Sequence, residues 1–328
     1  MKKINLGIIG LGYIGMLHLR HSLKLRNANV VAVADASKKS LKKARDVGIR
    51  RLYTNYEEIL KDPGIDAVII SLPTYLHLES ARKSAEAKKH ILLEKPIARS
   101  VKEAREIVSA AKRNSVKLMI SYPLRFNTAF KAVKKKIESG IFGDIELAHA
   151  TYVSAGPFFH RAEGTTPVPV PEWWFDKKLT GGGALIDVGC HLINLFRWYF
   201  GEITKIKSYL RHRFNMNFED SATCLAKFES GTLTVITAAW FSQDFHIEVN
   251  LFGSVKCETL QVRPFNSLSD IIRMLIGGTS KLHQPHYAEL EYFVNCIIND
   301  QYPSPSGVDG LKDLEAITKA YENQISLD

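Results

Sequence analysis

The fold is decided by the stretch Ile4-Asn5-Leu6-Gly7-Ile8-Ile9-Gly10-Leu11-Gly12-Tyr13-Ile14-Gly15, in which a short apolar run leads directly into a G-x-G-x-x-G turn and then a helical pattern. Gly10 allows the tight turn, Gly12 lets the backbone approach a pyrophosphate, and Gly15 permits close packing of the helix on the strand. Free N–H groups at the helix start would face the phosphate charge. A glycine-rich turn of some other α/β fold is the alternative. The predicted dinucleotide-binding turn comprises Gly10, Gly12, Tyr13, Ile14 and Gly15.

An acidic residue follows this turn at the spacing that dinucleotide sites use. Asp35 ends the next strand-like run, 20 residues after Gly15, where a carboxylate can accept hydrogen bonds from the adenosine ribose hydroxyls. The same carboxylate repels the 2′-phosphate of NADP, so NAD is favoured as the cofactor. Ser37, Lys38 and Lys39 lie just beyond and could receive that phosphate, which leaves NADP open.

Two domains are expected from the pattern of apolar runs along the 328 residues. Residues 1–122 alternate short, continuously apolar strands with helices, which predicts a parallel sheet covered on both faces, a doubly wound α/β domain. Residues 123–328 carry longer segments rich in β-branched and aromatic residues, separated by turns, together with helical patterns. These predict a second α/β domain with a large, mostly antiparallel sheet, whose strands are expected at Ile145–Ser154, Ile203–Phe214, Ala222–Phe228, Thr232–Phe241 and Phe245–Phe252.

Composition and charge exclude several classes of protein. With 45% hydrophobic residues the chain can bury a large core, and disorder is excluded. The net charge of +10 divides into +13 for residues 1–122 and −3 for the remainder. The basic residues follow helical spacing without interleaved aromatic residues, which favours a solvated helix face over a nucleic-acid site. We therefore expect no nucleic-acid partner. The excess of basic over acidic side chains lies on the domain that is predicted to bind a pyrophosphate.

Cysteine spacing and apolar runs indicate the compartment of the protein and whether it associates with a membrane. The cysteines are each more than 30 residues apart, so no C-x-x-C metal or redox pair exists and a reducing cytoplasm is expected. No uncharged apolar stretch approaches the roughly 18 residues that span a bilayer, so no membrane association is expected. Lys2-Lys3 and the apolar run after them are similar to a signal peptide, but glycines break the run and no small-residue cleavage site follows.

Two further clusters could carry chemistry. Glu94-Lys95-Pro96 follows a predicted strand at the sheet edge where ligands of open α/β sheets bind, and a lysine there can stabilise developing negative charge on an oxygen. A surface Glu–Lys pair is the alternative. In Gly181–His191, Asp187 and His191 are four apart, so on a helix they share one face about 6 Å apart at Cβ. His191 could act as a general base, since histidine titrates near neutral pH. The alternative is that His191 is an ordinary buried core residue. A metal site would need a third ligand, and none is evident.

Taken together, these motifs resemble the glucose–fructose oxidoreductase/inositol dehydrogenase family, also called Gfo/Idh/MocA. The resemblance covers nearly the whole chain and rests on the order and spacing of short motifs rather than on any one of them. They are Gly10/Gly12/Gly15 with His18, Ser71-Leu72-Pro73-Thr74 with His77, Glu94-Lys95-Pro96-Ile97-Ala98, Arg125-Phe126, Trp173-Trp174, Gly181–His191 and Gly307-Val308-Asp309-Gly310-Leu311.

The resemblance implies a Rossmann domain followed by a domain with a large open, mostly antiparallel sheet that mediates homodimers or homotetramers. Lys95, Asp187 and His191 match the family's catalytic residues. His191 would take the proton from a substrate hydroxyl, Lys95 would bind the same oxygen, and Asp187 would orient the substrate or the histidine. The neighbouring carbon would give its hydride to the nicotinamide. Positions matching the dinucleotide site are Ser71, Pro73, Thr74, His77, Glu94, Lys95 and Arg125, for which ordinary loop residues are the alternative.

The substrate is less closely defined. The loop with His160 and Arg161, together with Trp173, is expected to close over a sugar, where an aromatic floor suits a pyranose ring and Arg161 meets a phosphate or carboxylate. The pattern resembles the nucleotide-sugar 3-dehydrogenase branch; an inositol or free-sugar dehydrogenase is the alternative, and a non-catalytic dinucleotide-binding regulator is the alternative of another class. Asn194 stands where family members often carry an acid, so substrate contacts at that point are expected to differ.

Overall fold

The computed structural model describes residues 3–157, 170–214, 216–242, 244–262 and 284–326. The chain divides into two compact units. Unit 1 comprises Met1–Pro123 and His286–Lys312, and unit 2 comprises Leu124–Pro285 and Asp313–Asp328. The chain therefore passes between the units more than once, and each unit is described by itself.

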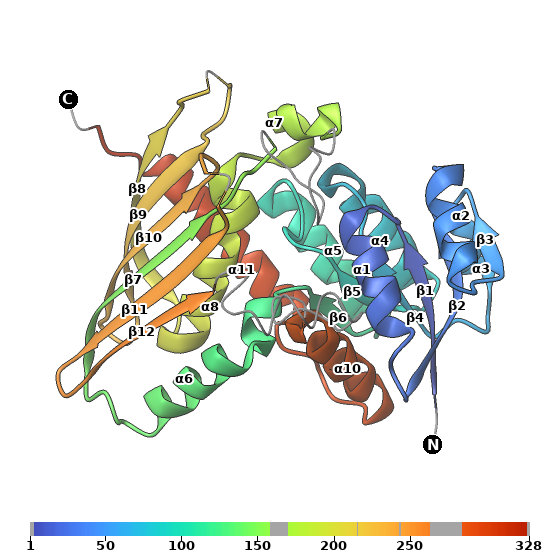
Figure 1. The fold of residues 1–328 in the computed structure, drawn as a ribbon, viewed down its shortest axis with the longest axis horizontal. Coiled ribbons are helices and arrows are strands. Elements are labelled where there is room, and N and C mark those ends of the chain that lie inside the picture. The colour runs from blue at the N-terminus through green and yellow to red at the C-terminus, as the bar shows by residue number, and fades with distance from the viewer. Residues whose placement is uncertain (1–2, 158–169, 215, 243, 263–283, 327–328) are drawn as a thin grey trace. The chain divides into compact units, whose positions relative to one another are not determined.

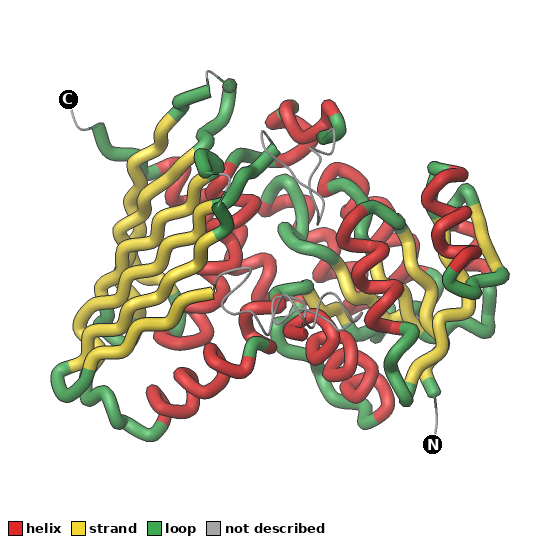
Figure 2. Tube along the Cα trace, in the orientation of Figure 1, coloured by secondary structure: helices red, strands yellow, loops and turns green. Residues whose placement is uncertain are grey.

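Unit 1 contains a six-stranded parallel sheet in the order β3-β2-β1-β4-β5-β6, with helices on both faces (Figures 1 and 2). This is the strand order of a Rossmann fold, as the sequence predicts. The strands are β1 (Ile4–Ile9), β2 (Ala28–Ala34), β3 (Arg51–Tyr53), β4 (Ala67–Ile70), β5 (His90–Leu93) and β6 (Leu118–Ile120). The helices are α1 (Tyr13–Ser22), α2 (Lys38–Asp46), α3 (Glu57–Lys61), η1 (Thr74–Leu76), α4 (His77–Glu86), α5 (Val101–Arg113) and most of α10 (Gln284–Ile298).

Residues 286–312 belong to unit 1, whereas the sequence predicts that everything after residue 122 belongs to the second domain. This segment completes the edge of the sheet, because Ser306 forms an antiparallel bridge with Met119 of β6. Gly307 lies so close to the same strand that a Cβ there would fall 2.4 Å from a methyl carbon of Leu118. An edge strand with apolar side chains needs cover, and a chain segment nearly 190 residues away supplies it.

Unit 2 contains a second six-stranded sheet in the order β12-β11-β7-β10-β9-β8. All neighbouring pairs are antiparallel except β7 and β10, which run parallel, so the sheet is mostly antiparallel as predicted. The strands are β7 (Ile145–Val153), β8 (Ile203–Arg211), β9 (Ser221–Phe228), β10 (Leu233–Ala239), β11 (His246–Gly253) and β12 (Cys257–Val262). The helices are η2 (Pro123–Phe126), α6 (Thr128–Glu138), η3 (Glu172–Phe175), α7 (Lys177–Thr180), η4 (Leu185–Gly189), α8 (Cys190–Phe200) and α11 (Gly307–Glu322), of which η2 and α11 straddle a unit boundary.

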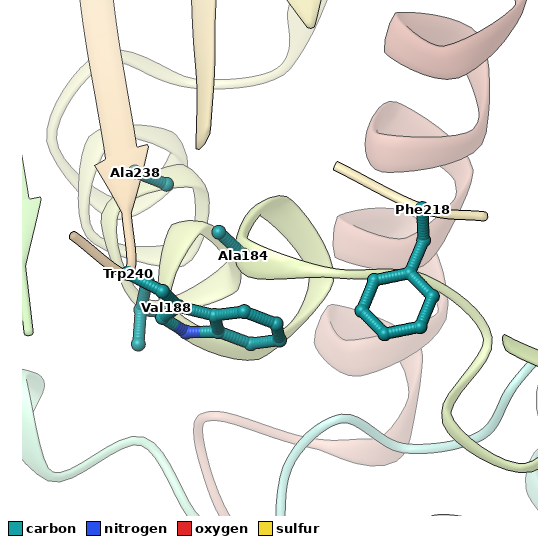
Figure 3. Close-up of a cluster of buried hydrophobic side chains, with 5 residues drawn as sticks. All are labelled: Ala184, Val188, Phe218, Ala238 and Trp240. Carbon is teal, nitrogen blue, oxygen red and sulfur yellow. The ribbon is translucent and has the colours of Figure 1, made fainter. Parts of the chain in front are cut away.

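Helices α8 and α11 lie against one face of this second sheet (Figure 1). Along β9 and β10 buried and exposed residues alternate, because successive side chains of a strand point to opposite faces. Next to η4 the inner face ends in a compact apolar cluster of Ala184, Val188, Phe218, Ala238 and Trp240 (Figure 3). The cluster places Trp240 directly beneath the turn that leads into α8.

One helical stretch, Lys177–Phe200, has the length and apolar composition needed to cross a membrane. In the described part of the chain, however, 83% of the apolar 18-residue window within this stretch is buried inside the protein. Burial of α8 against the sheet accounts for its apolar composition, because a core helix that is covered on most sides is hydrophobic all round.

Candidate functional site

The glycine turn after β1 has the geometry that the sequence predicts. Gly10 has a φ of +89°, which a residue with a side chain rarely adopts, and a Cβ at Gly15 would fall 2.0 Å from the Gly10 carbonyl oxygen. At Gly12, by contrast, no described atom lies within 4 Å of the Cβ position, so the backbone there is open to a ligand. Helix α1 begins after Gly12 without a side-chain cap, which leaves its first N–H groups available to an anion.

Asp35 lies beside the same turn and is held by two backbone N–H groups. Its Oδ2 accepts from Leu11 at 2.6 Å and its Oδ1 accepts from Ser37 at 2.7 Å. Each carboxylate oxygen can accept a further hydrogen bond, so the arrangement is preorganised for ribose hydroxyls. The Ser71 hydroxyl is buried beside Gly15 and has no hydrogen-bond partner among the described residues. An open glycine turn, a fixed carboxylate and an unsatisfied hydroxyl all fit a bound dinucleotide.

Glu94 and Lys95 follow β5 at the same edge of the sheet. Glu94 Oε1 lies 2.7 Å from Nε2 of His18, on α1, and Glu94 Oε2 accepts the Lys95 backbone N–H at 3.2 Å. Burial by itself raises the pKa of Glu94, but the hydrogen bond and charge of His18, together with Lys95, lower it to about 2. Glu94 is therefore a fixed anion, and it ties the backbone of Lys95 to the helix that starts at the glycine turn.

Three other predicted cofactor residues lie between the end of β4 and the start of α4. Pro73 and Thr74 lead into η1, and Thr74 is buried. The ring nitrogens of His77 lie 2.9 Å from the carbonyl oxygens of Pro96 and Leu72. Burial lowers the pKa of His77, which favours the neutral ring. His77 thus joins the loops after β4 and β5, and its cofactor contact stays a prediction.

In unit 2, Asp187 and His191 lie on one continuous helical stretch. The sequence predicts an α-helix here, but η4 is a π-helical turn, and His191 is the second residue of α8. A Cβ at Gly189 would lie 2.9 Å from a methyl carbon of Leu185 and 3.1 Å from Cβ of Ala238. Gly189 is therefore needed for close packing of this turn on β10. Single π-turns inside helices are frequent at functional sites.

The surroundings of this turn contain side chains that sequence reasoning missed. The Trp240 indole Nε1–H donates to Asp187 Oδ2 at 3.2 Å, and the ring of Tyr152 lies 5.8 Å from that of His191, centroid to centroid. Both come from ends of strands far from the motif in sequence. No spacing rule signals them, because only the pairing of β7, β10 and β11 brings them to the turn.

Trp173, predicted to contact substrate, lies on η3 next to Trp174, with ring centroids 5.5 Å apart. Trp174 in turn packs against Trp240, at 6.2 Å between centroids. The aromatic group expected from the sequence is therefore continuous with the cluster beneath Asp187. His160 and Arg161, the other predicted substrate residues, lie outside the described residues.

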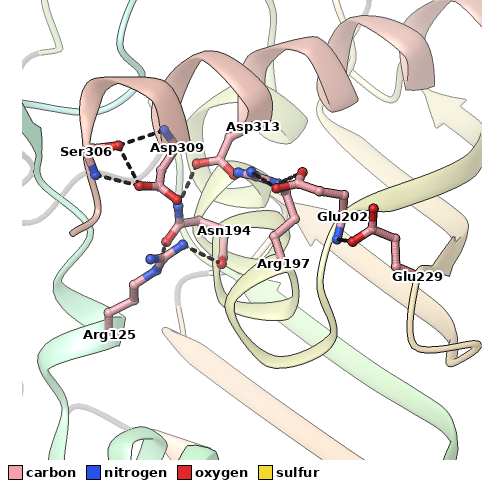
Figure 4. Close-up of polar contacts among 8 residues, drawn as sticks. All are labelled: Arg125, Asn194, Arg197, Glu202, Glu229, Ser306, Asp309 and Asp313. Carbon is pink, nitrogen blue, oxygen red and sulfur yellow. Dashed lines mark hydrogen bonds and ion pairs between the residues drawn. The ribbon is translucent and has the colours of Figure 1, made fainter.

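Arg125 and Asn194 form part of a buried polar network (Figure 4). Arg125 Nε donates to Asn194 Oδ1 at 2.7 Å, and Asn194 Nδ2 donates to Asp313 Oδ2 at 2.6 Å. Arg197 pairs with the same Asp313 and with Glu202. Asn194 is fully buried, so here it links Arg125 to α11. A cofactor contact of Arg125 stays a prediction.

Within the described ranges, no group of three or more His, Cys, Asp and Glu residues is arranged to hold a metal ion. Unit 1 offers a lysine at the same sheet edge as the dinucleotide turn, and unit 2 offers a carboxylate and a histidine on one helical stretch. Such groups suit proton transfer and stabilisation of charge on oxygen.

Comparison with known proteins agrees with this geometry. Residues 4–122 match the family described as "Oxidoreductase family, NAD-binding Rossmann fold", and residues 130–255 match the "GFO/IDH/MocA C-terminal domain". The chain is 29% identical to the scyllo-inositol 2-dehydrogenase (NAD(+)) of Bacillus subtilis (strain 168), over 98% of this chain and 95% of that protein. It is 26% identical to the myo-inositol 2-dehydrogenase of Thermotoga maritima, over 94% of this chain and 92% of that one.

Among solved structures, the WlbA dehydrogenase from Bordetella pertussis, in complex with NADH and UDP-GlcNAcA, superposes with a TM-score of 0.83. The match covers 98% of this chain and 95% of that one, at 22% identity, and shows a shared fold. The two matched sequence regions together span most of the 328 residues. The chain therefore belongs to the Gfo/Idh/MocA family of oxidoreductases, with the NAD-binding Rossmann domain at its N-terminal end.

Proposed function

We propose that this protein is an NAD-dependent dehydrogenase that oxidises a secondary hydroxyl of a cyclitol or sugar. The observation that carries the proposal is the stretch from Asp187 to His191, where Asp187 lies on a glycine-dependent π-turn and accepts the Trp240 N–H, and His191 follows in the first turn of α8. Two relatives that align with nearly the whole chain are named for inositols, which supports a polyol substrate.

In the proposed mechanism His191 is the general base that removes the proton from the reacting hydroxyl. The Lys95 ammonium donates to the same oxygen and stabilises the negative charge that develops there. Asp187, held by Trp240, orients the substrate or the imidazole. NAD would supply the acceptor for the hydride that leaves the carbon bearing the hydroxyl. The products are a carbonyl compound, NADH and a proton on His191.

The cofactor would be held mainly by backbone and by one carboxylate. The N–H groups that begin α1 would face the pyrophosphate, with Gly12 leaving room for it. Asp35 would accept the ribose hydroxyls and disfavour the 2′-phosphate of NADP. The remaining predicted cofactor contacts of the loops after β4 and β5 stay predictions; they are Ser71, Pro73, Thr74, His77 and Glu94.

A nucleotide-sugar substrate remains the second candidate. The sequence pattern favours that branch, and the UDP-GlcNAcA-bound dehydrogenase of Bordetella pertussis shares the fold. A nucleotide sugar adds a diphosphate, which needs cationic or N–H partners beyond those that a free polyol requires. The substrate panel described below separates the two candidates.

We further propose that the protein forms a homodimer or homotetramer through the outer face of its second sheet. We also propose that it works in a reducing cytoplasm, as its widely spaced cysteines suggest. The outer face of the second sheet carries apolar side chains on three neighbouring strands. Leu147 of β7 is paired with Leu233 of β10 on one side and with Phe252 of β11 on the other, and Leu233 and Phe252 are exposed. Exposed apolar patches of this kind mark association surfaces. Leu233→Glu should lower the mass measured by light scattering to that of a monomer; an unchanged mass would place the interface elsewhere.

The function is tested by following NADH formation with NAD or NADP across inositols, free and anhydro sugars, and UDP-sugars. Turnover of polyols or free sugars with NAD is expected. Turnover of UDP-sugars alone would instead support the nucleotide-sugar candidate. NADH binding without turnover of any substrate would contradict catalysis and support a dinucleotide-binding regulator.

A further inference from the structure

We propose that Glu219, together with the hydroxyl of Tyr321, is a positioning residue that fixes the start of the helical stretch bearing Asp187 and His191. The catalytic consequence rests on the function proposed above, whereas the structural role does not. Glu219 immediately precedes Asp220 and β9, and Tyr321 lies on α11. Neither belongs to the motif they hold.

Three consecutive backbone N–H groups of the stretch Gly181–His191 donate hydrogen bonds to Glu219. Leu185 N–H donates to Glu219 Oε1 at 2.9 Å, and Gly183 N–H lies 3.2 and 3.3 Å from its two carboxylate oxygens. Between them, Ala184 N–H donates to the Glu219 backbone carbonyl at 3.1 Å. The first N–H groups of a helix have no partner inside it, and η4 has no side-chain cap of its own. Glu219 thus acts as a cap supplied from 34 residues away.

Tyr321 completes this clamp from the opposite side. Its hydroxyl donates to Glu219 Oε1 at 2.8 Å, and Lys177 Nζ lies 5.9 Å from the centre of its ring. Burial raises the pKa of Tyr321, and the nearby Glu219 raises it further, so the phenol remains a donor. The side-chain oxygens of Glu219 therefore receive two backbone donors and one phenolic donor.

The glycines of the motif are explained by the same contacts. A Cβ at Gly183 would fall 1.8 Å from the Glu219 carbonyl oxygen, and a Cβ at Gly182 would fall 2.3 Å from the Tyr321 hydroxyl. No side chain fits at either position while the clamp is formed. Glycines before a helix allow a sharp turn or the close approach of another group to the backbone. In the structure, Gly182 and Gly183 allow the backbone to approach Glu219 and Tyr321.

Burial raises the pKa of Glu219, whereas the hydrogen bonds from Leu185, Tyr321 and Gly183 lower it, so the clamp is what favours the carboxylate form at this position. Among the described residues no cationic side chain pairs with Glu219, which is almost completely buried. Its compensation comes from N–H groups at a helix start, where a negative charge is favoured. Asp187 lies two residues beyond Leu185, so a shift of this end moves the carboxylate directly. A displacement of about 1 Å at a reacting group can lower a rate about a hundredfold.

The test compares Glu219→Gln and Tyr321→Phe with two matched controls. An amide at position 219 places an N–H₂ group against N–H donors, and Tyr321→Phe removes one hydroxyl while the carboxylate stays. Glu258→Gln is the carboxylate control. Glu258 lies on the edge strand β12 and pairs with Lys136. Tyr199→Phe is the phenol control, since its buried hydroxyl donates to the Phe130 carbonyl.

Amide hydrogen exchange over residues 181–191 gives a readout that needs no activity. Glu219→Gln should accelerate exchange in this segment at least tenfold, because a lost hydrogen bond to a charged group changes the local opening equilibrium by about that factor. It should also lower kcat at least tenfold and leave the NADH dissociation constant within about twofold. Tyr321→Phe should move both quantities in the same direction by a smaller factor, and the controls should move neither.

Exchange in residues 181–191 that matches the controls in both variants would overturn the clamp. Accelerated exchange with unchanged kcat would overturn its positioning role. If Glu219→Gln does not fold, Tyr321→Phe decides by the same two measurements. If the wild type turns over no polyol or sugar, the proposed function fails while the exchange experiment still tests the clamp.

Discussion

The indole N–H of Trp240 donates to the Asp187 carboxylate at 3.2 Å, from the end of a strand to a turn more than 50 residues earlier in the chain. Trp240 is itself buried among Ala184, Val188, Phe218 and Ala238 (Figure 3). A single side chain thus supports the π-turn by packing and orients its carboxylate by a hydrogen bond. These two roles can be separated by mutation.

Trp240→Phe should lower kcat about tenfold or more, because it removes a hydrogen bond to a charged group, about 1.5–3 kcal/mol, while keeping an aromatic ring in the cluster. Phe218→Leu removes packing from the same cluster without touching the donor, so it should lower the melting temperature and leave kcat nearly unchanged. Steady-state kinetics and thermal unfolding measure both. Equal loss of kcat in the two variants would mean that Trp240 contributes only packing.

His191→Ala should lower kcat by a factor of about 100 to 10,000, the range that a positioned general base contributes. NADH binding, measured by fluorescence titration, should remain nearly unchanged, because the dinucleotide turn lies in unit 1. The matched control is His149→Ala, which removes a histidine from the outer face of the second sheet. Survival of turnover in His191→Ala would show that another group is the base.

Asp35→Ser should shift cofactor preference from NAD toward NADP. The substitution removes the charge that repels a 2′-phosphate and keeps a small polar side chain near Lys38 and Lys39. The ratio of kcat/KM for NAD to that for NADP should fall at least tenfold. Asp46→Ser, at the exposed end of α2, should leave the ratio unchanged. A wild-type enzyme that works only with NADP would contradict the role assigned to Asp35.

Glu289→Gln should stabilise the protein increasingly as the pH rises. Glu289 is fully buried, and its Oε2 accepts the Ser121 hydroxyl at 2.9 Å. Burial, with the charge of Glu94, raises its pKa well above the ordinary value. Because the folded-state pKa is raised, this carboxyl favours folding most below the unfolded pKa of about 4.5, and that contribution is lost as the pH rises through the folded pKa.

Denaturant unfolding at about pH 5 and about pH 8 measures this effect. The difference in unfolding free energy between Glu289→Gln and wild type should grow between these values, at no more than about 1.4 kcal/mol per pH unit. Glu291→Gln, on the exposed face of the same helix, is the control. A difference independent of pH would mean that Glu289 does not titrate in this range.

The elements of the first sheet were predictable because their signals are local. Continuous apolar strands, a glycine turn and an acid at fixed spacing specify β1, α1 and β2 within 35 residues. Short elements without such signals were missed, namely β3, α3 and β12. The π-turn at η4 was also missed, since periodicity does not distinguish it from an α-helix.

The Rossmann turn with Asp35, the two-sheet architecture and the candidate residues Lys95, Asp187 and His191 could be predicted from local sequence patterns. The residues that hold the turn bearing Asp187 could not: Glu219 and Tyr321 contact its start and Trp240 its carboxylate. Only the tertiary structure shows these contacts and the return of residues 286–312 to the first unit. The physical reason is that propensity and spacing act over a few residues, whereas these contacts join segments brought together by strand pairing and by the return of the chain.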